Sequence, residues 1–172
     1  MILMLRYTGQ IHAYLSSPMP IQRSPIQGPL SLTDYYQHIA ASTNPVDRLE
    51  GEQMLQLLTL LDSLFPQLPL WGVTSMARLG LSPDPRYGSE WWVLISANAI
   101  PGSYEIEYLM PVDRRPWVGA VVQGTSYSWE QTTEYLLLAM RESGAWAANP
   151  AFNAVLAHHR LEQAREDDAE KK

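Results

Sequence analysis

The clearest pattern in the chain is an alternation of apolar and polar side chains over residues 104–110. Tyrosine and aliphatic side chains fill every second position, and Glu105 and Glu107 stand between them. Neighbouring side chains of a strand point to opposite faces of a sheet, so this run predicts a strand with one buried face. Residues 91–97 alternate in the same way, and Pro101-Gly102 between the two runs predicts a hairpin.

Three further segments have the composition of strands: residues 3–15, residues 71–81 and residues 117–125. Residues 16–30 contain several prolines, which remove backbone donors and favour extended conformations, so a long loop is predicted there. Loops of that length are often functional, and a plain surface connection is an equally good interpretation.

Helix starts are marked by side chains that can accept hydrogen bonds from the first-turn amides. Four helices are predicted on this basis: residues 32–41 after Ser31, a second from Pro45 after Asn44 that Pro66 ends, a third after Ser128 with Gln131 that Gly144 ends, and a fourth from Pro150 after Asn149. Gly51 is predicted to be a weak point of the second helix, because glycine is a poor helix former.

These elements predict a single α+β domain over residues 1–172. Its antiparallel sheet of about five strands would carry helices mainly on one face, with two helices at the C-terminus. A chain of 172 residues with 46% hydrophobic residues contains enough apolar material for one packed core. Residues 162–172 are highly charged, and we expect them to fray.

The formal net charge of −6 changes which partners are expected. An acidic chain repels phosphate groups, so neither nucleic acid nor an anionic membrane is predicted as a partner, and a basic protein fits better.

Cysteine is absent, which excludes disulfides and cysteine nucleophiles. The first residues do not form a secretory signal, so we expect a cytoplasmic protein. The only lysines are Lys171 and Lys172, and this preference for arginine suggests a bacterial genome rich in G and C.

The most specific idea for catalysis is a carboxylate metal site. Glu105 and Glu107 point the same way from one strand, and Asp84 and Asp113 stand in flanking loops. Oxygen ligands of this kind suit Mg²⁺ or Mn²⁺. The order Pro-Asp84 followed by Glu105-Ile-Glu107 resembles the PD-(D/E)xK nuclease pattern, which implies metal-dependent hydrolysis. Glu107 stands where that pattern has lysine, so no metal and no cofactor are predicted.

Other arrangements of reactive side chains are less specific. The adjacent pair His158-His159 points about 100° apart on a helix, so the two imidazoles cannot face one ion. The run from Gly124 to Ser128 resembles the G-x-S-x-G motif of serine hydrolases, but Ser128 is better explained as a helix cap. Four arginines could bind an anion if their loops met at one end of the sheet: Arg78, Arg86, Arg114 and Arg115. No catalytic residue is predicted.

The predicted site is therefore a protein-binding surface. Trp91 and Trp92 are consecutive in a strand, so one of them must lie on the face that carries the glutamates. We predict that this surface consists of Glu105, Glu107, Trp92 and Leu94, and that it recognises a basic protein.

The function predicted from these features is a non-catalytic binding module of the bacterial immunity or inhibitor type, which blocks a basic effector. Two alternatives stay open. One is a secretion chaperone or adaptor, in which the loop of residues 16–30 and the charged last helix would dock. The other is a divergent metal-dependent nuclease or hydrolase that uses Asp84, Glu105 and Glu107. The oligomeric state does not follow from the sequence.

Overall fold

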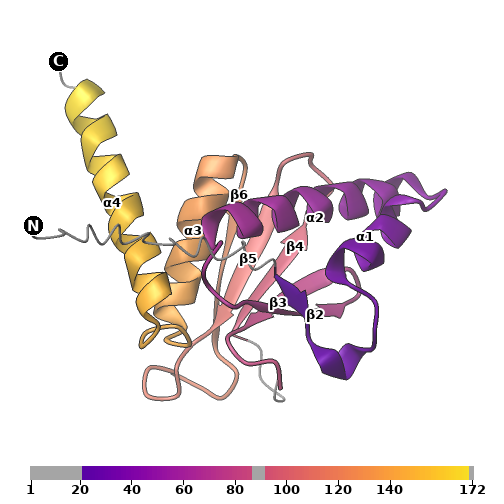
Figure 1. Cartoon of the computed structure of the whole chain (residues 1–172), viewed down its shortest axis with the longest axis horizontal. Coiled ribbons are helices and arrows are strands. Elements are labelled where there is room, and N and C mark those ends of the chain that lie inside the picture. Colours follow the sequence, from indigo (N-terminus) through magenta and orange to yellow (C-terminus); the bar gives the residue numbers. More distant parts are fainter. Residues whose placement is uncertain (1–20, 87–91, 171–172) are drawn as a thin grey trace, which may run out of the picture.

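The computed structural model describes residues 21–86 and 92–170, with the backbone alone for residues 162–170. Figure 1 shows the elements, which are β1 (Gln22–Arg23), a 3₁₀ turn η1 (Pro25–Gln27), α1 (Leu32–Ala40), α2 (Pro45–Leu64), β2 (Trp71–Ser75), β3 (Arg78–Ser82), β4 (Val93–Ala97), β5 (Tyr104–Leu109), β6 (Val121–Ser126), α3 (Trp129–Glu142) and α4 (Pro150–Glu170). The strand predicted in residues 3–15, the first part of the proline-rich loop and Trp91 lie outside the described residues.

The strands form one sheet whose spatial order follows the chain order, β1-β2-β3-β4-β5-β6. β1 is parallel to β2, and all other neighbouring pairs are antiparallel. The predicted α+β class is confirmed, and the sheet is mixed and six-stranded rather than wholly antiparallel. β1, which was not predicted, lies within the predicted proline-rich loop and is only two residues long.

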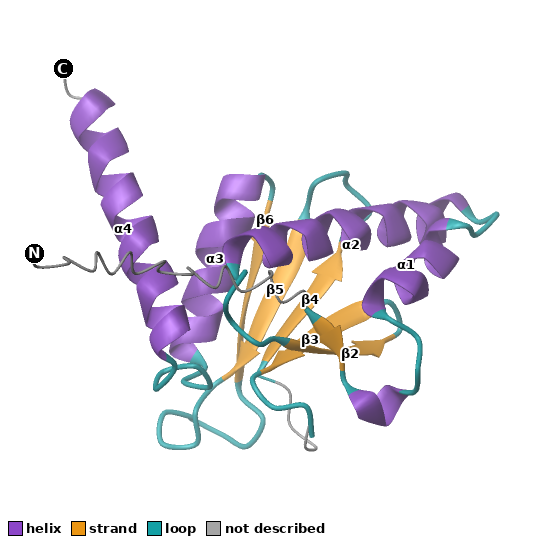
Figure 2. Ribbon diagram, in the orientation of Figure 1, coloured by secondary structure: helices purple, strands orange, loops and turns teal. Residues whose placement is uncertain are grey.

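The helices lie on one side of the sheet, as predicted (Figure 2). Side chains of α1, α2 and α3 form one buried cluster with alternate residues of β3, β4 and β5. In β5, Tyr104 and Ile106 face this cluster and are buried. α4 joins the helical layer through Phe152, whose ring lies 6.4 Å from the rings of Phe65 and Trp146. Burial of this apolar surface is the main force that holds the helices on the sheet.

The prediction of one strand over residues 71–81 was wrong, because the segment is a hairpin of β2 and β3. Met76 and Ala77 form its turn with positive φ angles of 47° and 63°. Two-residue hairpin turns of this kind are usually made by asparagine and glycine, which tolerate positive φ. The turn was missed because Met-Ala carries no such signal, so the segment has the composition of one continuous strand.

The last strand also begins later than predicted, at Val121 instead of residue 117. Trp117 is 68% exposed and Val118 is 96% exposed, so both lie in the loop before the strand. Gly119 has a φ of 77°, a conformation that glycine adopts at no steric cost and that ends the loop before β6 begins.

Gly51, predicted to be a weak point of α2, is a position where α1 packs closely on that helix. A Cβ atom built on Gly51 would lie 2.3 Å from the backbone nitrogen of Ala40, at the end of α1. Only glycine lets the two helices approach this closely, so its poor helix propensity is offset by the contact. The caps of both helices are as predicted, because Ser31 accepts from the amide of Asp34 and Asn44 accepts from the amide of Val46.

Gln53 of α2 fixes the turn between β4 and β5 and was not predicted. This buried side chain donates to the carbonyl of Asn98 at 2.7 Å and accepts from the amide of Gly102 at 2.8 Å. The hydroxyl of Tyr104 donates to the main-chain carbonyl of Gln53 at 2.9 Å. Buried polar groups are costly unless they are hydrogen-bonded. These contacts therefore fix the position of the β4–β5 hairpin relative to α2.

α3 begins and ends close to the predicted residues, and α4 begins at Pro150 as predicted. α4 continues to Glu170, through most of the residues that were expected to fray. The Ser128 hydroxyl accepts from the Gln131 amide at 3.2 Å, and Gln131 returns a bond by accepting from the Tyr127 amide. Gly144 follows α3 with a φ of 76°, and Asn149 caps α4 by accepting from the Ala151 amide. Trp129, the first residue of α3, is 40% exposed, although its ring lies 5.3 Å from that of Tyr104.

Ser128→Ala is expected to lower stability by about 1 kcal/mol through loss of this cap. For a protein of this size, that change corresponds to a fall in melting temperature of about 2–4 °C. Thermal unfolding followed by circular dichroism measures the change. Ser128→Asp keeps an acceptor and should retain the melting temperature, so equal losses in both variants would contradict the capping role.

None of the helices in residues 21–86 and 92–170 is both long and apolar enough to cross a membrane.

Candidate functional site

The face of the sheet opposite the helices, which we call the second face, carries three rows of residues that run across the strands. The first row is Ser75, Arg78, Ser96, Glu105 and Thr125. The second row is Val73, Gly80, Leu94, Glu107 and Gln123. The third row is Trp71, Ser82, Trp92, Leu109 and Val121. The strand register and a hydrogen bond from the Leu109 amide to the Trp92 carbonyl place these neighbours. No helix of the described chain packs on this face.

Three of the four predicted site residues lie together in the first two rows. Leu94 is directly opposite Glu107, and Glu105 lies two residues before Glu107 on the same strand, opposite Ser96. All three side chains are half-buried by their neighbours in the sheet. Trp92, the fourth, is half-buried in the third row and packs against the core cluster.

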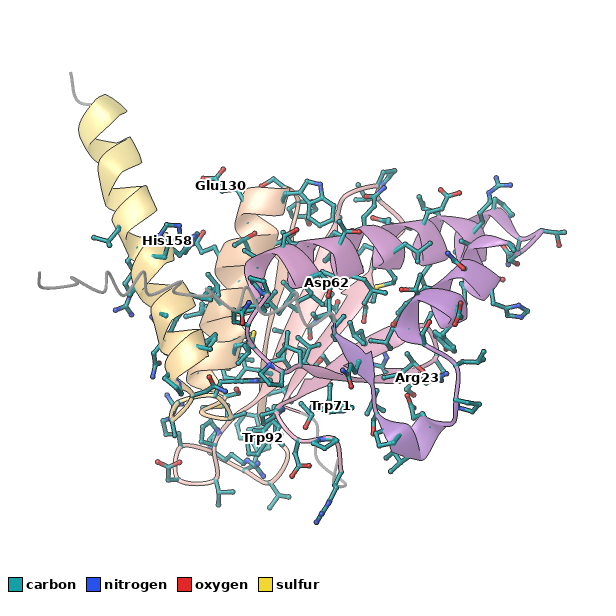
Figure 3. The ribbon with its side chains drawn as sticks, viewed as in Figure 1. Arg23, Asp62, Trp71, Trp92, Glu130 and His158 are labelled. Carbon is teal, nitrogen blue, oxygen red and sulfur yellow. The ribbon has the colours of Figure 1, made fainter. Side chains whose placement is uncertain are left out.

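The third row is closed at Ser82 and Leu109, whereas Val121, at its β6 end, is exposed. Ser82 is 3% exposed and Leu109 is 8% exposed, although neither side chain points to the helices. Figure 3 shows Trp71 and Trp92, also of the third row, at one end of the sheet. The accessible part of the second face is therefore formed mainly by the first two rows, which carry the carboxylates, and by Val121 at the β6 edge.

Glu107 is the electrostatically perturbed group of the second face. Partial burial raises the pKa of its carboxyl above the ordinary value of 4.5, and the neighbouring Glu105 raises it further. Arg78, in the first row, acts in the opposite direction by favouring the charged form. The ionised carboxylate of Glu107 is thus less stable in the isolated protein than in water, and an additional cation beside it would relieve this penalty.

Glu107→Gln is expected to raise the melting temperature at about pH 7, because it removes a carboxylate whose ionised form is disfavoured in the folded state. The folded pKa lies above the unfolded one, so the penalty is full above the folded pKa and vanishes below the ordinary value of 4.5. The two proteins should therefore melt alike at about pH 3.5.

Melting curves of both proteins across this pH range give the result, and Glu52→Gln, on the exposed side of α2, shows the general effect of removing one negative charge. A stabilisation by Glu107→Gln that persists unchanged at the acidic end would show that the carboxylate is not its source.

The arginines considered as an anion site do not converge. Arg114 donates to Glu142 at 2.8 Å, and this hydrogen bond is the main reason that the pKa of Glu142 is lowered. Arg115 donates to the carbonyl of Met110. Arg114 thus attaches the loop of residues 110–120 to the end of α3, and Arg115 bonds within that loop. Arg78 is the member of the set that lies on the second face.

The residues considered for metal or serine chemistry are also dispersed. In the described part of the chain, no three histidine, aspartate or glutamate side chains are grouped to hold a metal ion. Asp84 caps its own turn by accepting from the Arg86 amide at 2.8 Å. Ser126 is buried, with its hydroxyl 2.8 Å from that of Thr132, and Ser128 caps α3.

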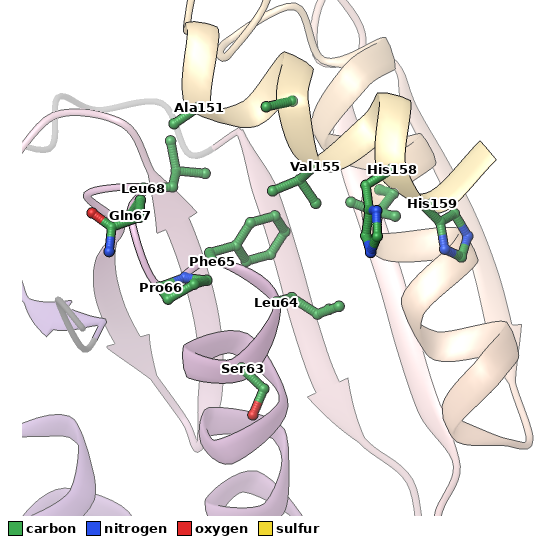
Figure 4. Close-up of a pocket in the computed structure, with 12 residues that line it drawn as sticks. Ser63, Leu64, Phe65, Pro66, Gln67, Leu68, Ala151, Val155, His158 and His159 are labelled. Carbon is green, nitrogen blue, oxygen red and sulfur yellow. The ribbon is translucent and has the colours of Figure 1, made fainter. Parts of the chain in front are cut away.

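A cavity of about 420 Å³ lies on the helical side, between the end of α2 and α4 (Figure 4). Its walls are mainly apolar and include Leu64, Phe65 and Val155, with His158 and His159 at one side. The hydroxyl of Ser63, which also lines it, donates to the carbonyl of Thr59 at 2.9 Å. These groups can hold an apolar side chain, and they do not combine a nucleophile with a base.

Sequence reasoning missed Trp71, Val73 and Arg78 as members of the second face. The sequence of residues 71–81 does not reveal the turn at Met76 and Ala77. Without that turn, the sheet face on which each of these side chains lies could not be determined. Comparison of the chain with protein-family models, with curated proteins and with solved structures gives no match.

Proposed function

We propose that this protein is a non-catalytic binding module of the immunity or inhibitor type, which uses the second face to cover a basic effector protein. One observation carries the proposal. Glu105 and Glu107 lie half-buried beside Leu94 on a sheet face that no described helix covers.

The electrostatics of this face favour a cationic partner. The raised pKa of Glu107 means that its charge is poorly stabilised in the isolated protein, because Arg78 offsets only part of the effect of burial and of Glu105. A lysine or arginine brought by a partner would stabilise both carboxylates. The net charge of −6 would also speed the approach of a basic protein.

The apolar residues of the second row supply the rest of an interface. Val73 and Leu94 flank Gly80, which has no side chain, so the centre of the face is flat and apolar. An apolar centre with charged groups beside it is the usual arrangement of a protein interface. A binding role is favoured over metal-dependent hydrolysis because Asp84, the third carboxylate of that alternative, caps its own turn. Among the residues that the structure describes, no three histidine, aspartate or glutamate side chains are grouped to hold a metal ion.

The test is to capture the partner from the source cells with the tagged protein, and to measure the composition of the purified complex and the activity of the partner. We expect a basic protein in a one-to-one complex whose own activity is inhibited. A dimer of this chain that holds unfolded segments of many proteins would favour the chaperone alternative, and turnover of a substrate by this chain would favour the hydrolase alternative.

A further inference from the structure

The outer edge of β6 presents backbone groups that have no strand partner among the described residues. β6 is the last strand of the sheet and pairs with β5 alone. The Met110 amide donates to the carbonyl of Ala120 at 3.0 Å. This bond shows which residues of β5 and β6 form hydrogen-bonded pairs. In an antiparallel ladder every second residue bonds to the neighbour. Val122 and Gly124 therefore turn their amides and carbonyls to β5, whereas Val121, Gln123 and Thr125 turn theirs outward.

This edge is accessible and is not protected in the ways that edges usually are. Val121 is 41% exposed and Val122 is 40% exposed, and Gln123 is also exposed. Natural sheets commonly protect an edge with lysine, proline, a bulge or a covering segment, because unpaired amides and carbonyls invite another strand. β6 contains neither a charged residue nor a proline.

A groove runs beside this edge on the helical side of the sheet. It has a volume of about 270 Å³ and lies between β5, β6 and α3. Val122, Tyr135 and Leu138 give it apolar walls, and Leu138 is 42% exposed. Gly124 has no side chain, so the floor beside the Tyr135 ring stays open. A strand added to β6 would direct every second side chain towards this groove.

We propose that β6 accepts an extended segment of the partner as a seventh strand, with apolar side chains in the groove beside α3 and basic side chains on the second face. This inference rests on the proposed function and names the kind of segment that the site binds. Backbone bonds to Val121, Gln123 and Thr125 would supply affinity, and alternate side chains would supply specificity, as in other peptides that bind by strand addition.

The charges of the neighbouring strand determine which residues the added strand needs. Side chains opposite Gln123 and Thr125 would lie on the second face, two strand spacings or about 10 Å from the backbone of Glu107 and Glu105. Lysine and arginine are long enough to approach the carboxylates across that distance. A second copy of β6 would offer only valine, glutamine and threonine at these positions, so the charges favour a basic partner segment over self-association.

The test uses a fluorescent peptide in which valine and lysine alternate over six residues, with fluorescence anisotropy as the measurement. A peptide of the same composition with its three lysines in one block serves as the control. The alternating peptide is expected to bind at least about tenfold more tightly, because only it can place its lysines and valines on opposite sides of one strand. Equal binding of the two peptides would overturn the proposal by showing attraction of charge alone.

Two substitutions of Gln123 separate backbone pairing from the side chain. Gln123→Pro removes an outward amide without removing a bond to β5, and proline is tolerated on edge strands. It should weaken peptide binding about tenfold or more, whereas Gln123→Ala keeps the amide and should bind almost normally. Melting curves verify that both variants are folded. Leu138→Asp should weaken binding through the groove, and peptide binding that is unchanged in both Gln123→Pro and Leu138→Asp would overturn the proposal.

The outcomes separate this inference from the proposed function. If the natural partner binds through Glu105 and Glu107 and is unaffected by Gln123→Pro, the binding function stands and strand addition is wrong. If the alternating peptide binds the edge but no basic effector is captured, strand addition stands and the proposed inhibitor function is wrong. Concentration-dependent dimers that Gln123→Pro abolishes, without peptide binding, would assign the edge to a second copy of the chain and overturn the choice of occupant.

Discussion

Replacing Glu105 and Glu107 together with lysine is expected to weaken binding of the basic effector by at least about a hundredfold, while the protein stays folded. The change replaces two carboxylates by like charges facing the partner, and repulsion of this kind costs several kcal/mol at an interface. Isothermal titration at two ionic strengths measures the loss. Because the charges also guide the approach of the partner, the effect on the association rate should be largest at low salt.

The matched control is Glu52→Lys with Glu134→Lys, which changes the net charge equally on exposed positions of α2 and α3. It should retain most of the affinity, because those side chains lie on the helical side of the protein. If the two double variants bind equally, or if the second-face variant binds as the natural sequence does, this face is not the interface.

Gly51→Ala is expected to destabilise the protein by about 3 kcal/mol, against the usual rule that alanine strengthens a helix. The added methyl group would meet the backbone of Ala40 at 2.3 Å, and a backbone atom cannot move aside as a flexible side chain can. α1 must therefore shift away from α2, and Leu32 and Tyr36 would lose part of their packing. Denaturant unfolding measures the loss, which corresponds to a fall in melting temperature of about 6–12 °C.

Glu52→Ala, at the next position of α2, is the control for helix propensity, because the Glu52 side chain is exposed. It should change stability by less than about 0.5 kcal/mol. A melting temperature that rises in Gly51→Ala would show that α1 adjusts without cost, and that the close approach of the two helices is not needed for stability.

The helix boundaries could be predicted because their causes are local. Ser31, Asn44, Ser128 and Asn149 each accept a hydrogen bond from an amide two or three residues later, so the signal and its effect lie within one turn of helix. The alternating faces of β5 could be predicted for a similar reason, because the two-residue period of a strand is fixed by its backbone.

The features that could not be predicted depend on contacts between distant residues. β1 is too short to have a pattern and is defined by its pairing with β2 across α1 and α2. The packing role of Gly51 was missed because the helix that approaches it is a separate element. The turn at Met76 and Ala77 has no local signal, and the sheet imposes its positive φ angles from both sides.

The same division applies to the candidate site. The glutamates and Leu94 were placed on one face by alternation alone, but their neighbours in the rows needed the register of strands. The outward amides of β6 could be assigned only from the hydrogen bonds between the strands. The polarity of the side chains does not determine which residues of a strand bond to its neighbour. Sequence reasoning therefore grouped the glutamates with Leu94 and did not find their neighbours in the rows.

The agreement between strand order and chain order affects how the protein folds. From β2 to β6 each strand pairs with the strand made just before it, so few long loops must close before pairing stabilises the sheet. Such local connectivity favours rapid folding for a protein with this much sheet. It also allows the meander to grow strand by strand during synthesis, with β6 added last. The outer edge of β6 therefore exists only on a completed meander, so a molecule that binds there distinguishes chains whose sheet has formed from those whose sheet is still forming.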